Sequence, residues 1–319
     1  MRILMTGAGG FVGRAVLREL QGRGDVGEIV VTDLHEAALR DLPDDPCLRR
    51  MPGDICDAGF RAQLFARPVD SIFHFAATLT THAEANFDHG MQVNLQAVRD
   101  LLEAGRAQGN CPRFLYPSSV AAFGGPLPEV VDDSVVHTPQ TSYGVAKAVS
   151  ELFIDEYSRR GFVDGRVLRL PIVLVRPGAS SPAISDKVSA LVRDTLRGED
   201  VVCPLAPDTR IPVASVQAVA RAFLTLHDAP ASAFGHTRAM NLPSLTVTVA
   251  EIVDALERVD HPAPRGKVIW QKDERIQSIV ESWPRVFVSE AATRLGIEAE
   301  DSFAEIIEAF LSGQHAETR

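Results

Sequence analysis

The chain has 319 residues, of which 45 % are hydrophobic and 23 % are charged. These fractions are those of a soluble globular protein, and the length predicts one large domain with a smaller one attached. Lysine and arginine total 32 against 42 acidic residues, a net charge of −10 without a long basic run. We therefore expect neither nucleic acid nor a membrane surface as a partner.

The N-terminus and the cysteines bear on the compartment. The opening apolar run, before the first glycine, is too short for a signal peptide or a spanning helix, so we expect the protein to stay in the cytoplasm. The cysteines stand at 47, 56, 111 and 203 without a CxxC pair. This spacing predicts neither a disulfide framework nor a metal site.

Short β-branched runs alternate with amphipathic helical stretches from residue 1 to about residue 175, which is typical of parallel βαβ units. The predicted fold class is α/β, a doubly wound parallel sheet of the Rossmann type over residues 1–175. The expected strands are 2–6, 28–33, 48–52, 71–76, 113–118 and 166–173, and the expected long helices are 11–23, 85–107 and 142–160.

The texture changes after residue 175, because prolines become frequent and the predicted helices are shorter, at 216–226, 249–259 and 303–311. We expect residues 176–319 to form mainly a smaller substrate-binding subdomain. It is expected to be discontinuous, with some segments returning to the large sheet. Whether residues 179–200 close as a lid stays open.

A glycine-rich stretch follows the first predicted strand and opens a helix. Gly7, Gly10 and Gly13 stand at G-x-x-G-x-x-G spacing. Glycines here allow positive φ, let backbone N–H groups approach a pyrophosphate, and pack the helix close to the sheet. The helix opens with Phe11 and Val12, and its N-terminus adds about half a positive charge facing the phosphates. By itself, the motif is equally compatible with an ordinary glycine-rich turn.

Acidic residues at the ends of the next two strands favour NAD as the ligand of this loop. Asp33 follows Gly13 by 20 residues, where a carboxylate accepts both ribose hydroxyls of adenosine and repels a 2′-phosphate. No arginine stands beside it, so NAD is favoured over NADP. Asp54 and the backbone of Ile55 follow the third strand, where they are placed to meet the adenine; the alternative for Asp54 is a solvated loop residue.

Tyr143 and Lys147 form a Y-x-x-x-K pair one helical turn apart, so both side chains lie on the same face. An ammonium beside a phenol favours the phenolate and lowers the tyrosine pKa from about 10, which makes tyrosine a usable base. Ser119 ends the fifth strand, at the sheet edge where ligands of such folds bind. Its hydroxyl is placed to hold a substrate oxygen beside Tyr143, or else to cap a turn.

The chain resembles the extended short-chain dehydrogenase/reductases, which include NAD-dependent sugar-nucleotide epimerases and dehydratases, and the resemblance covers nearly the whole length. It is carried by TGAGGFVG at 6–13, Asp33, GDI at 53–55, HFAA at 74–77, Asn94, PSSVAAFG at 117–124, SYGVAK at 142–147 and LRLPIVLVRPG at 168–178.

The resemblance implies roles for the matching residues. It implies phosphate contact at the glycines, the ribose at Asp33, the adenine at Asp54 and Ile55, and the dinucleotide backbone at Ala76 and Ala77. It places Pro171 beside the nicotinamide and gives the catalytic roles to Ser119, Tyr143 and Lys147, with the last also meeting the nicotinamide ribose. Asn94 is expected to bond a neighbouring backbone group or an ordered water.

Within this family, residues 126–178, SWPRVF at 282–287 and LGIEAEDSF at 295–303 resemble the branch of D-erythronate dehydrogenases. As a hypothesis, the substrate is a short sugar acid whose C2 hydroxyl is oxidised, as that resemblance implies for D-erythronate giving 2-dehydro-D-erythronate. Its carboxylate calls for an arginine, and Arg176 and Arg210 are the candidates. Thr78 and Thr80 are candidate partners for substrate oxygens.

Two other functions stay open. One is a nucleotide-sugar epimerase or dehydratase that keeps NAD tightly bound, and the other is an NAD-binding sensor without chemistry. The family resemblance also predicts a homodimer, in which helices 85–107 and 142–160 pair across a two-fold axis.

Overall fold

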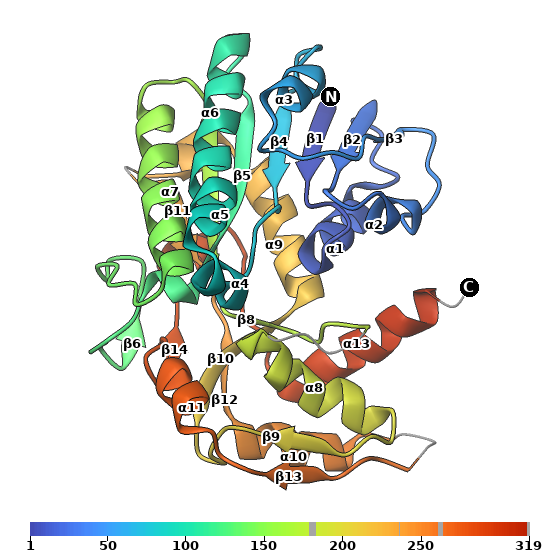
Figure 1. Ribbon diagram of the computed structural model, residues 1–319, viewed down its shortest axis with the longest axis vertical. Helices are drawn as coiled ribbons and strands as arrows, with labels where there is room; N and C mark the ends of the chain where they lie inside the picture. Colours follow the sequence, from blue (N-terminus) through green and yellow to red (C-terminus); the bar gives the residue numbers. More distant parts are fainter. Residues whose placement is uncertain (179–182, 236, 261–263, 318–319) are drawn as a thin grey trace.

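A parallel sheet is the centre of the larger part of the molecule (Figure 1). The computed structural model describes residues 1–178, 183–235, 237–260 and 264–317. Within these residues, seven strands lie in the order β11-β7-β5-β4-β1-β2-β3, and every neighbouring pair is parallel. Their bounds are β1 Arg2–Thr6, β2 Glu28–Thr32, β3 Leu48–Arg50, β4 Ser71–His74, β5 Arg113–Ser119, β7 Asp164–Leu170 and β11 Ala239–Asn241.

Helices cover both faces of this large sheet, as the doubly wound prediction requires. Strand β1 is buried on both faces of the sheet. Ile3 and Met5 belong to the core on one face, and Leu4 belongs to the core on the other. One face carries α1 (Phe11–Leu20) and α9 (Val216–Asp228), and the other carries α3 (Ala58–Leu64), α6 (Ala97–Gln108) and α7 (Ser142–Arg159). The predicted α/β fold class is confirmed.

The strand order creates a switch point at the centre of the sheet. The chain runs outward from β1 to β2 and β3, and then crosses back to place β4 on the other side of β1. The loops that follow β1 and β4 therefore diverge and leave a crevice at their carboxyl ends, the place where open α/β sheets bind ligands.

The expected strand 166–173 is wrong as a single element. It is two strands, β7 in the large sheet and β8 (Ile172–Leu174), which pairs with β10 (Arg210–Ser215) in a separate sheet. Pro171 separates them, because proline has no N–H to donate to the ladder. The chain therefore leaves the large sheet at Leu170 and enters the separate sheet at Ile172, next to the crevice.

The expected helix 85–107 is found as an uninterrupted helical run over residues 87–108, with a break before it and a π-helical turn within it. Helix α4 (Thr80–Ala85) ends at Asn86, whose backbone leaves the helical region and whose side chain accepts a hydrogen bond from the N–H of His89 to begin α5 (Phe87–Met91). A π-helical turn, η1 (Gln92–Gln96), then precedes α6. The polar side chain of Asn86 competes with the helix backbone, which the apolar periodicity did not reveal.

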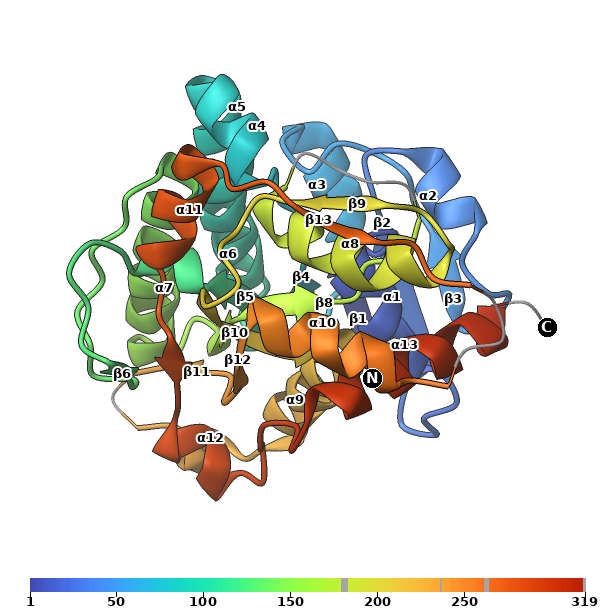
Figure 2. The same ribbon diagram turned by 90° about the horizontal axis from the view of Figure 1, so that it is seen from below.

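A second apolar core lies below the large sheet. The elements around it are β8, β10, α8 (Ile184–Leu196) and those whose bounds are given below, and together they are called the small lobe. Figure 2 looks onto it from below the large sheet. Helix α8 buries Leu191 and Val192 against this core. The other elements are β9 Val201–Cys203, β12 Leu245–Thr248, α10 Val249–Arg258, β13 Val268–Trp270, α11 Glu274–Glu281 and α13 Phe303–Glu317.

The remaining elements are short, and each connects or flanks the parts described above. They are α2 Glu36–Arg40, η2 Val120–Ala122, β6 Val130–Val131, η3 Ala231–Ala233, β14 Val286–Phe287 and α12 Glu290–Arg294. Strands β6 and β14 pair with each other, so they join the segment before α7 to the C-terminal part of the chain.

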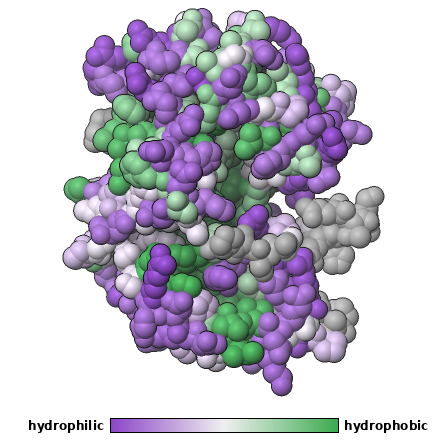
Figure 3. All heavy atoms as spheres, in the orientation of Figure 1, coloured by the Kyte–Doolittle hydropathy of each residue, from purple (hydrophilic) through white to green (hydrophobic). Residues whose placement is uncertain are grey.

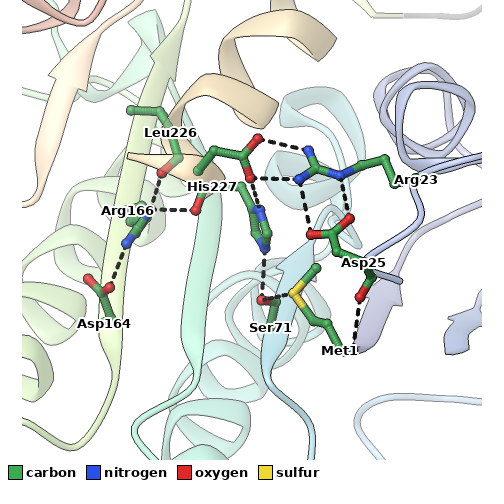
Figure 4. A network of polar contacts seen from close by, with 9 residues as sticks. Met1, Arg23, Asp25, Ser71, Asp164, Arg166, Leu226 and His227 are labelled. Atoms are coloured by element: carbon green, nitrogen blue, oxygen red, sulfur yellow. Dashed lines mark hydrogen bonds and ion pairs between the residues drawn. The ribbon is translucent and has the colours of Figure 1, made fainter. Parts of the chain in front are cut away.

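Helix α9 comes from the C-terminal half of the sequence but packs on the large sheet beside α1. Arg166 of β7 donates hydrogen bonds to the carbonyls of Leu226 and His227, where α9 ends, and pairs with Asp164 at 2.6 Å (Figure 4). The His227 ring in turn lies 2.9 Å from the Ser71 hydroxyl on β4. Strand β11 also comes from the C-terminal half, and it pairs with β7 at the edge of the large sheet. The domain boundary at residue 175 stays a prediction.

Candidate active site

A cleft of about 370 Å³ opens at the carboxyl ends of the central strands, between the large sheet and the small lobe. In the space-filling view a hollow is visible between the upper and lower parts of the molecule, with apolar side chains at its base (Figure 3). The cleft brings together twelve of the residues expected at the site, namely Gly7, Gly10, Phe11, Val12, Gly13, Ala77, Thr80, Ser119, Tyr143, Lys147, Pro171 and Arg176.

The glycine loop at one end of the cleft leaves no room for side chains. Gly7 has φ +66°, and a Cβ there would lie 2.5 Å from the backbone nitrogen of Ala76. A Cβ on Gly13 would collide with the Gly7 carbonyl oxygen. Because Gly10 precedes the first turn of α1, the free N–H groups of that turn face the cleft, and the cradle fits a pyrophosphate.

The expected adenosine contacts lie beside this loop and do not line the cleft itself. The Asp33 carboxylate accepts a hydrogen bond from the Gly9 N–H at 3.2 Å, which fixes it next to the loop. The Gly53 N–H donates to the Asp33 carbonyl at 3.0 Å, so the segment with Asp54 and Ile55 follows directly. The Asp54 carboxylate closes a local turn with the Cys56 N–H, while Ile55 is buried.

Ser119, Tyr143 and Lys147 meet from two elements. Ser119 is the last residue of β5, and its hydroxyl accepts the Ala121 N–H at 3.1 Å, so the turn-capping role weighed from sequence is present as well. Tyr143 and Lys147 stand on α7, which begins where the Thr141 hydroxyl accepts the Gly144 N–H. The Lys147 ammonium donates to the Pro117 carbonyl at 2.7 Å.

Burial has the largest effect on the pKa values of Tyr143 and Lys147. It raises the pKa of Tyr143 to about 12, and a hydrogen bond with Ser119 acts in the opposite direction. It lowers the pKa of Lys147 to about 7, while the Glu151 carboxylate acts to raise it. The expectation that Lys147 lowers the tyrosine pKa is therefore not met, because burial of the phenol itself has the larger effect and the Lys147 ammonium lies 5.5 Å from the Tyr143 ring centre.

The threonines after β4 are held by Asn94. Its side-chain oxygen accepts the Thr78 N–H and its amide donates to the Thr78 carbonyl, both at 2.9 Å. Asn94 lies in the π-helical turn, which presents this side chain to the neighbouring loop. Thr80 lines the cleft and Thr78 does not. This clamp on Thr78, 16 residues away in sequence, is a bond to a neighbouring backbone group, as the family resemblance implied for Asn94.

Of the two arginine candidates, the structure places only Arg176 in the cleft. Arg210 lies outside it and pairs with Glu129 on the surface. The backbone of Arg176 is fixed at both ends by α8, because its N–H donates to the Ser189 hydroxyl at 3.3 Å and its carbonyl accepts from Arg193 at 3.0 Å. Arg193 is fully buried and pairs with Asp186 at 2.8 Å.

Sequence reasoning missed the wall that faces Tyr143 from the small lobe. It consists of Ser185, Asp186 and Ser189 on α8, with Trp283 after α11. No motif marks the α8 residues, which belong to the 179–200 segment left open as a lid; residues 179–182 lie outside the described residues. Trp283 carried a signal, since it is one of two tryptophans in the chain.

Two further expectations concern metals and membranes. In the part of the chain that the structure describes, no group of three or more His, Cys, Asp or Glu side chains is arranged to hold a metal ion. Across those same described residues, no helix combines the length and apolar character needed to cross a bilayer.

Comparisons with known proteins agree with this architecture. The model of the NAD dependent epimerase/dehydratase family matches residues 3–242. The D-erythronate dehydrogenase of Cupriavidus necator is 42 % identical over 318 residues, 98 % of either chain. That of Haemophilus influenzae is 34 % identical over 98 % of this chain and 99 % of its own.

A solved structure extends the likeness to three dimensions. It is the nucleoside-diphosphate-sugar epimerase from Agrobacterium tumefaciens, which is 32 % identical and has a TM-score of 0.90 over 99 % of this chain and 95 % of its own. The family match spans more than half of the sequence, and it includes both the glycine loop and the pair on α7. This chain belongs to the NAD dependent epimerase/dehydratase family.

Proposed function

We propose that this protein is an NAD-dependent dehydrogenase that oxidises the C2 hydroxyl of a short sugar acid, with D-erythronate going to 2-dehydro-D-erythronate. The observation that carries the proposal is one cleft lined by the glycine loop, by Tyr143 with Ser119 and Lys147, and by Arg176. The relative at 42 % identity, which is named for D-erythronate, supports the choice of substrate.

The proposed cofactor site follows the glycine loop to the sheet edge. The first turn of α1, from Phe11 to Gly13, holds the pyrophosphate, and Asp33 binds the adenosine ribose. Asp54 and Ile55 border the adenine. Ala76, Ala77 and Pro171 border the rest of the dinucleotide, with Lys147 on the nicotinamide ribose. When bound, NAD supplies the acceptor for the hydride that leaves C2.

The proposed substrate site lies at the other end of the cleft. Arg176 binds the carboxylate, since a guanidinium presents parallel N–H donors to two oxygens. Thr80 meets a hydroxyl of the substrate, and the clamped Thr78 backbone keeps that loop in place. Ser119 holds the C2 oxygen, and Tyr143 removes its proton as general base.

The proton step requires the pKa of Tyr143 to fall from the value near 12 that burial imposes. The cationic nicotinamide ring of bound NAD and a protonated Lys147 next to the phenol would both lower the Tyr143 pKa, because a positive charge favours the phenolate. The base therefore becomes active once the cleft is filled, which couples proton removal to ligand binding.

A homodimer in the cytoplasm completes the proposal. Helices α6 and α7 pack side by side, and α7 exposes Val145 at 39 % and Leu152 at 66 %. These residues are seven apart, so they share one face of the helix, where a second copy can cover them. The four cysteines are all unpaired, which fits a reducing compartment.

The test is a panel of erythronate, threonate and longer aldonic acids, in both enantiomers, together with UDP-sugars. The purified protein is mixed with NAD, and NADH is followed by absorbance, with Tyr143→Phe as the control. NADH from D-erythronate that disappears in the variant supports the proposal. Interconversion of a UDP-sugar without net NADH favours the epimerase that the Agrobacterium structure is named for. Binding of NAD without any turnover favours the sensor.

A further inference from the structure

A buried ion pair stands next to Lys147 and has no part in the proposed mechanism so far. Glu151 follows Lys147 by one turn on α7, so both side chains lie on the same face, and both residues are buried. Arg169 reaches Glu151 from β7, with Nε 3.0 Å and Nη2 2.8 Å from Oε2. Two donors on one carboxylate oxygen make this a charge-assisted pair.

The ion pair is held rigidly from the side away from the cleft. Arg169 also donates to the Asn241 side-chain oxygen at 3.2 Å. Asn241 is anchored in turn, because its amide donates to the Val131 and Val288 carbonyls and its N–H donates to Asp133 at 2.7 Å. A fixed network of this kind maintains the distance between the Glu151 charge and Lys147.

The other titratable groups beside the Lys147 ammonium, among the residues that the structure describes, lie on β4, β5 and its own helix. His74 of β4 and Tyr116 of β5 lie beside it, with the Tyr116 ring centre 4.3 Å from Nζ, and Tyr143 of its own helix is 5.5 Å away. Burial lowers the pKa of His74 to about 3, so this ring is neutral at working pH. His137 lies 3.6 Å from Glu151, and burial lowers its pKa as well.

We infer that Glu151 is a positioning residue that keeps Lys147 in its ammonium form, and that Arg169 sets how strongly it does so. The carboxylate attracts a proton onto the lysine across one helical turn, in a site where burial removes the stabilisation by water. The positive charge of Arg169 offsets part of the effect of the Glu151 carboxylate on Lys147. The importance of the ammonium for catalysis rests on the proposed function, whereas the electrostatic inference does not.

The inference predicts opposite effects for two variants that break the same ion pair. Glu151→Gln removes the negative charge and lowers the Lys147 pKa by about one unit from its value near 7. Arg169→Gln removes the competing positive charge and raises the Lys147 pKa by a similar amount. If the role of the ion pair is purely structural, the Lys147 pKa moves in the same direction in the two variants or does not move in either.

Lysine NMR tests this directly, because the chain has only the four lysines Lys147, Lys187, Lys267 and Lys272. The full-length protein is labelled with ε-¹³C-lysine, and the shifts are followed from pH 5 to pH 10, with and without NAD. Lys147→Arg assigns the signal. Midpoints that move down in E151Q and up in R169Q support the inference, and midpoints that stay, or move together, overturn it.

A control variant separates charge from packing. Asp164→Asn breaks the ion pair with Arg166, which is buried on the same strand β7 and whose other hydrogen bonds go to the Leu226 and His227 carbonyls. It is expected to lower the melting temperature and to leave the lysine midpoint in place. Should E151Q not fold, the double variant E151Q/R169Q, which leaves no unpaired charge, replaces it: a lysine midpoint below that of R169Q supports the inference, and a midpoint equal to that of R169Q overturns it.

Activity gives a second readout with the active substrate. The alkaline limb of the kcat/KM profile should move to lower pH in E151Q and to higher pH in R169Q. Absence of turnover in the wild-type protein would count against the proposed function only, because the NMR midpoints are measured without substrate. Turnover with unmoved midpoints would count against the role of Glu151 only.

Discussion

The two ends of the cleft are built by different means. At the cofactor end, backbone conformation and the absence of side chains make the site, since Gly7 and Gly13 leave no space for a Cβ. At the proposed substrate end, side chains form the site, and a buried arginine on α8 holds the backbone of Arg176. A site made of backbone is short and local in sequence, whereas a site made of side chains gathers distant residues.

The largest effect is expected where the two ends meet. Tyr143→Phe removes the phenol oxygen and leaves both ends intact, so kcat should fall about 10³-fold, the usual size for loss of a general base. Binding of NADH, followed by fluorescence, should be unchanged. A variant that keeps a tenth of the wild-type kcat would show that another group removes the proton.

Breaking only the cofactor end should have the next largest effect. Gly13→Ala forces a methyl group against the Gly7 carbonyl, so NAD affinity should fall about 30-fold, in line with the cost of overpacking. Gly24→Ala is the matched control, because a Cβ there meets nothing within 4 Å. Calorimetric titration with NAD measures both. Equal affinities in the two variants would contradict the cradle.

Breaking only the substrate end should leave the cofactor untouched. Arg176→Met is expected to raise the KM for D-erythronate about 20-fold, because a charge-assisted pair is lost, without changing NAD affinity. Arg210→Met serves as the control, since that side chain pairs with Glu129 outside the cleft. Steady-state kinetics on both variants decides, and a larger change for Arg210 would reverse the assignment.

The smallest effect is expected at the edge of the cofactor end. Asp33→Asn keeps an oxygen for the Gly9 N–H but loses the charge, so NAD affinity should fall about fivefold. The loss for NADP should be smaller, because repulsion of a 2′-phosphate is removed. The ratio of the two dissociation constants is the measurement, and an unchanged ratio would exclude Asp33 from cofactor selection.

The same contrast explains what the sequence predicted. The parallel sheet, the glycine loop and the grouping of Ser119 with Tyr143 and Lys147 could be predicted, because each depends on local spacing or on the end of a strand. The break at Pro171 was missed because the strand continues as apolar residues on both sides. The α8 wall was missed because no motif marks Ser185, Asp186 or Ser189, and Asp186, although buried, resembles a solvated helix residue in sequence.

The backbone clamp on residue 176 has a consequence for how such enzymes diversify. Both of its hydrogen bonds involve main-chain atoms of residue 176, so they persist whatever side chain stands there. Substitution at this one position therefore changes the chemical group presented to the cleft, and to the substrate in the proposed function, without reshaping the scaffold. New specificities can arise by single mutations here, and position 176 is the natural first choice for redirecting the enzyme in the laboratory.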